Sequence, residues 1–168
     1  MEKQIIESEP ETTLSVEGGK FLSFYLGKEE YAIEILKVQE IIGLMPITPT
    51  PNMPEYIRGV LNLRGTIIPV MDLRNRFNLK QVEDTSETCI IILKEEDIHM
   101  GIVVDRVSEV TFIDSSQIEN VPSSKFTDTN DYLFGIGKVK DTVKMILNMH
   151  KVVFNVPSNV LHASSKED

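Results

Sequence analysis

Short runs of alternating apolar and polar residues fill the chain between residues 19 and 156. Each run is bounded by Gly, Pro, Asp or Lys-Glu clusters, which is the pattern of strands joined by turns. The runs are FLSFYL, YAIEI, VQEII, GVLNL, TIIPVM, CIIIL, MGIVV, VSEVTFI, FGIGKV and TVKMIL. Ten short strands with little helix between them predict an all-β fold of barrels or a sandwich, and they do not fit a parallel α/β sheet.

Helical signals are few and short. PEYIRG is expected to form a single turn, DLRNRFN follows a strand with Asp72 as its N-cap, and NMHKVVF lies near the end of the chain. Pro69 interrupts TIIPVM and has no N–H to donate to a neighbouring strand. This strand is therefore expected at a sheet edge or at a bulge.

The two halves of the chain resemble each other. YAIEILKVQEI matches MGIVVDRVSEV without a gap 69 positions further on, so that Glu40 corresponds to Glu109. GVLNLRGTIIPVMDL matches GIGKVKDTVKMILNM 76 positions further on, so that Arg64 corresponds to Lys140. Two gapless matches in the same order indicate an internal duplication, and the larger second offset predicts a longer loop in the second half.

The duplication predicts two similar units of about five strands, approximately residues 19–84 and 85–156. Five strands suit a small barrel filled by its own side chains, which leaves the outer surface and the seam between the units for function. Residues 1–18 are acidic and poor in core-forming side chains, so we expect a flexible arm there. Residues 157–168 are expected to form a flexible tail.

Composition excludes several partner classes. The formal net charge of −9 and the pI near 4.9 argue against nucleic acid and against an anionic membrane surface. No apolar run approaches the ~20 residues that span a bilayer, so direct membrane insertion is not expected, and the acidic N-terminus does not look like a secretory signal. The single cysteine, Cys89, lies in the apolar run CIIIL and is interpreted as a small buried side chain of a cytoplasmic protein.

Motifs for catalysis, cofactors or metals do not stand out. The three histidines are scattered, and neither a phosphate-binding loop nor a nucleophile motif is present. Glu40 and Glu109 recur at matching positions, as a glycosidase pair would, but the chain has no Trp and only 7% aromatic residues to form a sugar platform. We therefore expect a protein without enzymatic activity, cofactor or metal ion.

Apolar surface is the remaining functional signal. In the strand that contains VQEI, Val38 and Glu40 point to one face, while Ile41 points to the other, so both faces carry apolar residues. A strand covered on one face only would keep its apolar residues there. Either the seam between the two units or a partner protein covers the second face, and the sequence leaves both interpretations open.

The succession FLSFYLGKEEYAIEILKVQEI, MPEYIRGVLNLRGTIIPVMDLRNRF and GIVVDRVSEV closely resembles the CheW family of chemotaxis coupling proteins. The resemblance covers essentially all of residues 19–156, and the NLRG, PVxDL and VDxV blocks are specific when they occur together in this order. It implies two SH3-like five-stranded β-barrels packed side by side, with short helical turns and a short C-terminal helix.

The resemblance also implies the function. CheW-like proteins bridge the cytoplasmic tip of chemoreceptors to the regulatory domain of the histidine kinase CheA, in arrays at the inner face of the membrane. Carried over residue by residue, the partner-binding positions of the family are Val38, Glu40, Gly59, Arg64, Asp105 and Val107. The chain departs from the family pattern at Asn148, where an Asp that caps the last helix is common.

Two rival interpretations stay open at this point. The chain could be a CheV-type protein cut from its receiver domain, or a coupling protein of another pathway. Alternatively, the seam between the barrels could hold a small ligand, as in an enzyme or a sensor. Within the adaptor interpretation, we expect Arg64 and Glu40 to pair and to present an ordered charged patch, because an Arg fork binds a carboxylate and keeps donors for a second acceptor.

Overall fold

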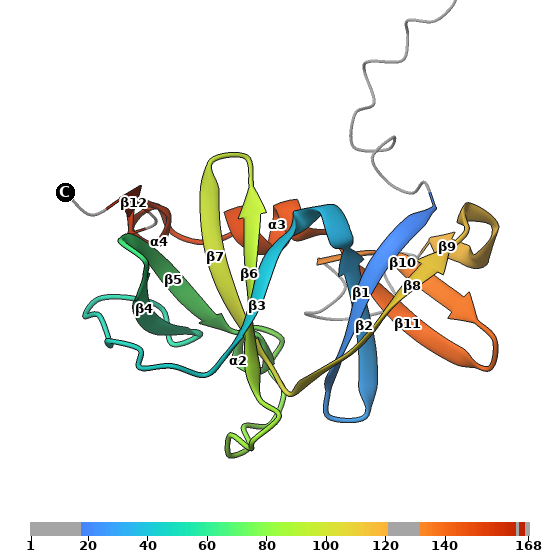
Figure 1. Ribbon diagram of the computed structural model, residues 1–168, viewed down its shortest axis with the longest axis horizontal. Helices are drawn as coiled ribbons and strands as arrows, with labels where there is room; N and C mark the ends of the chain where they lie inside the picture. Colours follow the sequence, from blue (N-terminus) through green and yellow to red (C-terminus); the bar gives the residue numbers. More distant parts are fainter. Residues whose placement is uncertain (1–17, 121–131, 164, 167–168) are drawn as a thin grey trace, which may run out of the picture.

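The computed structural model describes residues 18–120, 132–163 and 165–166, and it shows two six-stranded β-sheets side by side (Figure 1). The expected all-β fold with few short helices is confirmed. The expected arm lies outside the described residues apart from Gly18, and so does part of the expected longer loop, at residues 121–131. The described helices are too short to cross a membrane.

The first sheet has the strand order β8-β1-β2-β11-β10-β9. All its neighbouring strands are antiparallel except β2 and β11, which run parallel. Its strands are β1 (Gly19–Leu26), β2 (Glu29–Glu34), β8 (Arg106–Ile113), β9 (Ile118–Asn120), β10 (Leu133–Val139) and β11 (Thr142–Leu147).

The second sheet has the order β12-β5-β7-β6-β3, and β4 pairs with the other side of β5. Here β5 and β7 form the parallel pair. Its strands are β3 (Val38–Gly43), β4 (Ile57–Leu63), β5 (Thr66–Asp72), β6 (Cys89–Glu95), β7 (Ile98–Val104) and β12 (Ser165–Lys166). We call the first sheet barrel A and the second barrel B.

The two barrels do not coincide with the two halves of the sequence. Barrel A combines β1 and β2 from the first half with β8, β10 and β11 from the second, and barrel B combines β3, β4 and β5 with β6 and β7. The expected division into residues 19–84 and 85–156 is therefore wrong as a description of the barrels. Each half contributes its first hairpin to the barrel that the other half completes (Figure 1).

Short connections lie at the two points where the chain changes barrel. Strands β2 and β8 both run antiparallel to β1, so a third strand of the first half placed beside β1 would run parallel to β2. Parallel strands of one sheet need a crossover of about a dozen residues. The link from β2 to β3 is the three-residue turn η2 (Ile35–Lys37), and the link from β7 to β8 is Asp105 alone. Neither link is long enough for such a crossover, and in the structure each leads into the other barrel.

The duplication itself is visible in matching backbone features. A Cβ on Gly59 would lie 2.1 Å from the carbonyl oxygen of Thr48, and a Cβ on Gly135 would lie 2.4 Å from that of Glu119. Arg64 and its counterpart Lys140 both adopt positive φ, 53° and 56°. The two glycines thus permit the same close approach of a crossing strand at equivalent places in the two barrels.

The largest core lies in the seam between the barrels. Side chains from both hairpins and from the helices after β5 and β11 form it, including the ring series Phe24, Tyr31, Phe77 and Tyr132 with centroids 5.5–5.8 Å apart. Burial is the main cause that raises the pKa of Tyr31 to about 12, and nearby Glu29 adds to it. Smaller apolar clusters centred on Leu61 and Phe21 fill barrels B and A.

Short capped helices follow the last strand of each half. Asp72 caps α2 (Leu73–Arg76) by accepting from Asn75 N at 3.2 Å, as expected. Asn148 caps α3 (Met149–Phe154) in the same way, by accepting from Lys151 N at 3.2 Å. The departure from Asp at this position therefore leaves the cap intact, because an amide oxygen also accepts from a helix N–H.

Two local expectations need correction. Residues 157–168 are not a tail without structure, because α4 (Ser158–His162) buries Val160 completely and β12 pairs with β5. Pro69 is not on an edge strand, because β5 lies between β4 and β7, but a register shift between Ile57 and Gly59 on β4 lies beside it. Its partner Val60 on β4 exchanges backbone hydrogen bonds with Thr48, so Pro69 N points to the other side of β5. On that side β12 pairs with Thr66 and Ile67 and β7 pairs from Val70 onward, so Pro69 lies between the two pairings.

Candidate partner-binding surface

The turn between β4 and β5 presents Arg64 at one end of barrel B. Arg64 and Gly65 have φ values of 53° and 90°, so both central residues of this tight hairpin are left-handed. The side chain of Asn62 accepts from Gly65 N at 2.8 Å and holds the turn. Positive φ at both central residues is the usual backbone of a tight two-residue hairpin turn. The turn therefore fixes the direction in which Arg64 leaves the barrel.

Arg64 forms an ion pair with Glu40 on β3, as expected from the sequence. A guanidinium Nη2 donates to Glu40 Oε1, and the two side chains keep 67% and 30% of their surface exposed. Pairing between β3 and β6 shifts register between Val38 and Glu40, which marks a β-bulge. Bulges redirect side chains at sheet edges, and β3 is the outer strand of this sheet. The result is an ordered, exposed pair of opposite charges.

Val38 and Val107 occupy equivalent places on the outer strands β3 and β8. Both are partly buried and pack against the core in the seam between the barrels. Beyond them each strand exposes apolar surface: Ile41 is 44% exposed on β3, and its counterpart Val110 is 52% exposed on β8. The sequence left open whether the seam or a partner covers the apolar residues of these strands. The seam covers part of Val38 and Val107, and Ile41 and Val110 stay exposed.

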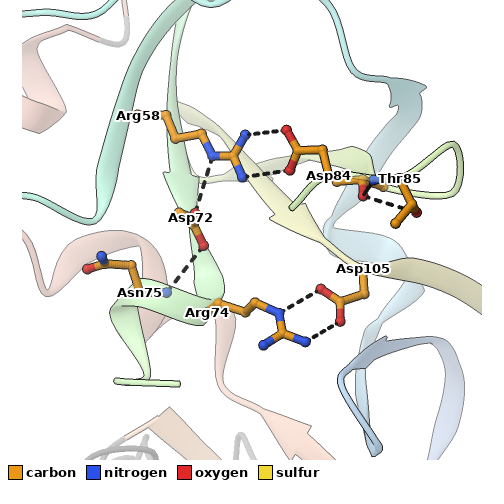
Figure 2. Close-up of polar contacts among 8 residues, drawn as sticks. Arg58, Asp72, Arg74, Asn75, Asp84, Thr85 and Asp105 are labelled. Atoms are coloured by element: carbon orange, nitrogen blue, oxygen red, sulfur yellow. Dashed lines mark hydrogen bonds and ion pairs between the residues drawn. The ribbon is translucent and has the colours of Figure 1, made fainter. Parts of the chain in front are cut away.

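Asp105 is held by internal contacts at the link from β7 to β8. Arg74 donates to its carboxylate twice, at 2.9 and 2.6 Å (Figure 2). Gly27 N donates to the same carboxylate at 2.7 Å. The hydrogen bonds from Arg74 are the main cause that lowers the pKa of Asp105. Since three internal donors use this carboxylate, Asp105 holds the crossover from β7 to β8.

Gly59 is buried in β4, and its role is also to hold geometry. With φ of 146° and the carbonyl of Thr48 where a Cβ would be, only glycine fits there without a shift of the backbone. Thr48 and Val60 exchange backbone hydrogen bonds at 2.8 and 2.9 Å beside it. Gly59 thus keeps the proline-rich segment that follows β3 against β4, close in sequence to the turn that carries Arg64.

Of the six residues expected to form the site, Arg64, Glu40 and Val38 lie together on barrel B. Val107 lies at the equivalent place of barrel A, Asp105 lies at the crossover between the barrels, and Gly59 is internal.

Comparison with known proteins identifies the family. A family model described as a CheW-like domain matches residues 20–155. The chain belongs to the CheW-like family. The chemotaxis protein CheW of Klebsiella aerogenes is 40% identical over 136 residues, which cover 81% of this chain and 82% of that protein. The chemotaxis protein CheW of Bacillus subtilis is 37% identical over 136 residues, which cover 81% and 87%.

A solved structure agrees with this assignment. The scaffolding protein TtCheW from Thermoanaerobacter tengcongensis superposes with a TM-score of 0.75 at 36% identity, over 80% of this chain and 92% of that one. Members of the CheW-like family are chemotaxis adaptors and scaffolds, so this chain is a chemotaxis adaptor with chemotaxis proteins as its partners. The family consists of adaptors, not enzymes.

Sequence reasoning missed the arginines that organise this CheW-like domain. Arg58 donates to Asp84 at 3.1 and 3.2 Å and to Asp72 at 3.3 Å, which ties the loop before β6 to the cap of α2 (Figure 2). Arg74 links that helix to Asp105. The DLR block that resembles the family contains both Asp72 and Arg74, but their partners lie far away in the sequence, and no local spacing indicates them.

A cluster of Glu95, Glu96 and His150 has the donor atoms of a metal site but a different electrostatic role. These atoms lie within 4.8 Å of one another. The ammonium of Lys37, however, lies 2.9 Å from Oε1 and 3.2 Å from Oε2 of Glu95, the one buried residue of the three. A cation bound there would meet a positive charge already in place. The cluster is therefore an ion-pair network that joins the first crossover to the turn after β6.

A pocket of about 330 Å³ beside α2 is the candidate for the alternative interpretation of a small-ligand site in the seam. Its central cation, Arg76, lies 4.1 Å from the ring centroid of Tyr56 and 5.1 Å from that of Tyr132, and it donates to Asn155 O at 2.6 Å. Tyr56 and Tyr132 are equivalent positions of the two halves. Arg76 is thus used in packing the two halves of the CheW-like domain together.

Proposed function

We propose that this CheW-like protein couples the cytoplasmic tip of chemoreceptors to the regulatory domain of the histidine kinase CheA. The observation that carries the proposal is the exposed Arg64–Glu40 pair, presented by a turn with two left-handed residues and a bulged outer strand. An exposed ion pair contributes only ~0–1 kcal/mol to folding, so fold stability alone does not account for such a fixed presentation. Recognition by a partner protein would account for this fixed presentation of the Arg64–Glu40 pair.

The proposal assigns different parts to the six site residues. Arg64 and Glu40 contact a partner with charge, and Val38 adds apolar contact beside them. Val107 offers an equivalent contact on barrel A, so that two partners can bind one molecule at the same time. Asp105 and Gly59 act by holding the crossover and the β3–β4 segment in place. In cells, the protein would thereby lie at the inner face of the membrane through its receptors.

Replacing Arg64 tests the proposal. If Arg64 is a central contact, Arg64→Ala lowers the affinity for a partner by about 2 kcal/mol or more and changes the melting temperature little. Titration against a receptor cytoplasmic fragment and against the CheA regulatory domain measures both affinities. An Arg64→Ala protein that binds both partners within about 0.5 kcal/mol of wild type would remove Arg64 from the site.

Lys138 supplies the matched control. It forms an ion pair with Glu119 at 2.8 Å, with side chains 57% and 63% exposed, on barrel A. The pair resembles the Arg64–Glu40 pair in exposure but does not lie on a turn with two left-handed residues. Lys138→Ala should leave both affinities unchanged. Loss of binding in both variants would point to a general effect of net charge, not to Arg64.

A further inference from the structure

Barrel A contains a buried ion pair between the two halves of the chain. The ammonium of Lys144 on β11 lies 2.5 Å from Glu30 Oε2 on β2, and the two side chains are only 2% and 8% exposed. The two residues are partners in the parallel pairing of β2 with β11. Glu109 on β8, 57% exposed, lies 3.4 Å from the same ammonium. The pair therefore lies where the hairpin of the first half docks onto the second half.

Barrel B has a different pair at the equivalent place. Its parallel register joins Val70 to Gly101, as barrel A joins Ile146 to Ala32, and the offsets of 76 and 69 relate these positions. By the same offsets, Ile68 stands where Lys144 is, and His99 stands where Glu30 is. Ile68 is 1% exposed in the apolar cluster of barrel B. The two docking places thus share an equivalent strand register, but an ion pair lies in barrel A where barrel B has an isoleucine and a histidine.

This difference matters because the fold is made by exchange of hairpins. The same docking could occur between two molecules, with the first halves of two chains exchanging hairpins with each other. Glu30 would then face Ile68, which leaves a buried carboxylate without a cation. In the second halves, Lys144 would face His99. Docking a hairpin onto the same half of another molecule therefore leaves the buried Glu30 or Lys144 without its partner of opposite charge. Docking a first-half hairpin onto a second half keeps the Lys144–Glu30 pair.

We propose that the Lys144–Glu30 pair directs each hairpin to the other half of its own chain and disfavours exchange between copies. Buried ion pairs are poor sources of stability but good determinants of pairing when a wrong partner leaves one charge uncompensated. The covalent connection between the halves favours the same outcome through a high local concentration. The ion pair adds a preference for the same pairing that does not depend on the length of the covalent connection.

Moving the lysine to the other half tests this proposal in the full chain. The double variant Ile68→Lys, Lys144→Ile moves the lysine to β5, in the same half as Glu30. Glu30 can then pair with this lysine only when its hairpin docks onto the first half of a second molecule. We expect dimers or longer assemblies after refolding at about 100 μM, measured as a mass by light scattering larger than that of wild type at the same concentration. Lys144→Ile alone should melt about 10 °C below wild type. A double variant with the wild-type mass would overturn the proposal.

Reversing the charges provides a second, independent test. Glu30→Lys, Lys144→Glu restores a pair between unlike halves, so we expect the wild-type mass and a melting temperature above that of either single variant. A reversed pair no more stable than its single variants would also overturn the proposal. Reversal of the exposed pair, Lys138→Glu with Glu119→Lys, is the control and should change neither mass nor melting temperature. None of these measurements depends on chemotaxis partners, so the proposed adaptor function is tested separately.

Discussion

Arg74 holds Asp105 with two hydrogen bonds of 2.9 and 2.6 Å, at the single residue that links β7 of barrel B to β8 of barrel A. At the equivalent positions of the duplicated unit stand His150 and Leu36, so the other crossover has no such contact. There, Leu36 is 92% exposed, and neighbouring Lys37 binds Glu95 instead. One crossover is thus fixed by an internal carboxylate and the other by a cation.

Asp105→Asn should destabilise the fold because it replaces two charge-assisted hydrogen bonds by weaker ones. Hydrogen bonds to charged groups contribute about 1.5–3 kcal/mol, so we expect a loss of about 2 kcal/mol in the free energy of unfolding, measured by urea titration. Glu119→Gln, at the exposed pair with Lys138, is the control and should stay within about 0.5 kcal/mol of wild type. Equal effects of the two substitutions would contradict a structural role of Asp105.

The same contact predicts a dependence of stability on pH. The pKa of Asp105 in the folded protein is below its ordinary value of 3.8, so the stabilisation is fully present above pH 3.8. It declines as the pH falls below that value, and it is lost below the folded pKa. The free energy of unfolding should therefore decrease less between pH 5 and pH 2.5 for Asp105→Asn than for wild type. Parallel curves would show that Asp105 does not contribute.

Gly59→Ala should be strongly destabilising, because the new Cβ would lie 2.1 Å from the carbonyl oxygen of Thr48. The backbone must shift or strain, and we expect a loss of about 3 kcal/mol or more in the free energy of unfolding. Gly43→Ala on β3 is the matched control, since no atom lies within 4 Å of the added carbon. If both alanine variants unfold at the same urea concentration, the close approach at Gly59 is not what requires glycine.

Val107 tests whether the two partner contacts are separable. We expect Val107→Arg to weaken binding of a receptor fragment at least tenfold and to leave binding of the CheA regulatory domain within about twofold, because an arginine disrupts an apolar contact that faces one partner only. Val82→Arg, at a loop position that is 49% exposed, controls for added charge. Equal loss of both partners in a folded Val107→Arg protein would contradict separate faces.

The sequence predicted much of the fold because strand patterns and repeats are local. Alternating runs located the strands, and the two offsets revealed the duplication. The exchange of hairpins was missed, because a match between Glu40 and Glu109 shows which strands are equivalent and not which barrel each one joins. The three-residue link around Leu36 excludes a crossover to the far side of its own hairpin, but it is compatible with an antiparallel hairpin in the same sheet, so link length alone did not reveal the exchange.

The site was predicted in part for a related reason. The Arg64–Glu40 pair followed from recurring charges at repeat positions, and the structure contains it. The charges recur in the second half, but the contact differs there, because Glu109 lies 3.4 Å from buried Lys144. Arg74 and Asp105 are 31 residues apart, and their repeat counterparts, His150 and Leu36, do not form an equivalent ion pair. Neither sequence spacing nor the repeat therefore indicates that the two residues meet.

The central claim is that one molecule of this chain binds a receptor and a kinase at the same time. Size-exclusion chromatography with light scattering of a receptor cytoplasmic fragment, the CheA regulatory domain and this protein measures that directly. The account predicts one complex that contains all three proteins, the absence of a receptor–kinase complex when this protein is left out, and a strongly reduced complex with Arg64→Ala but not with Lys138→Ala. Binding of the receptor fragment and the kinase domain in mutually exclusive complexes would contradict it.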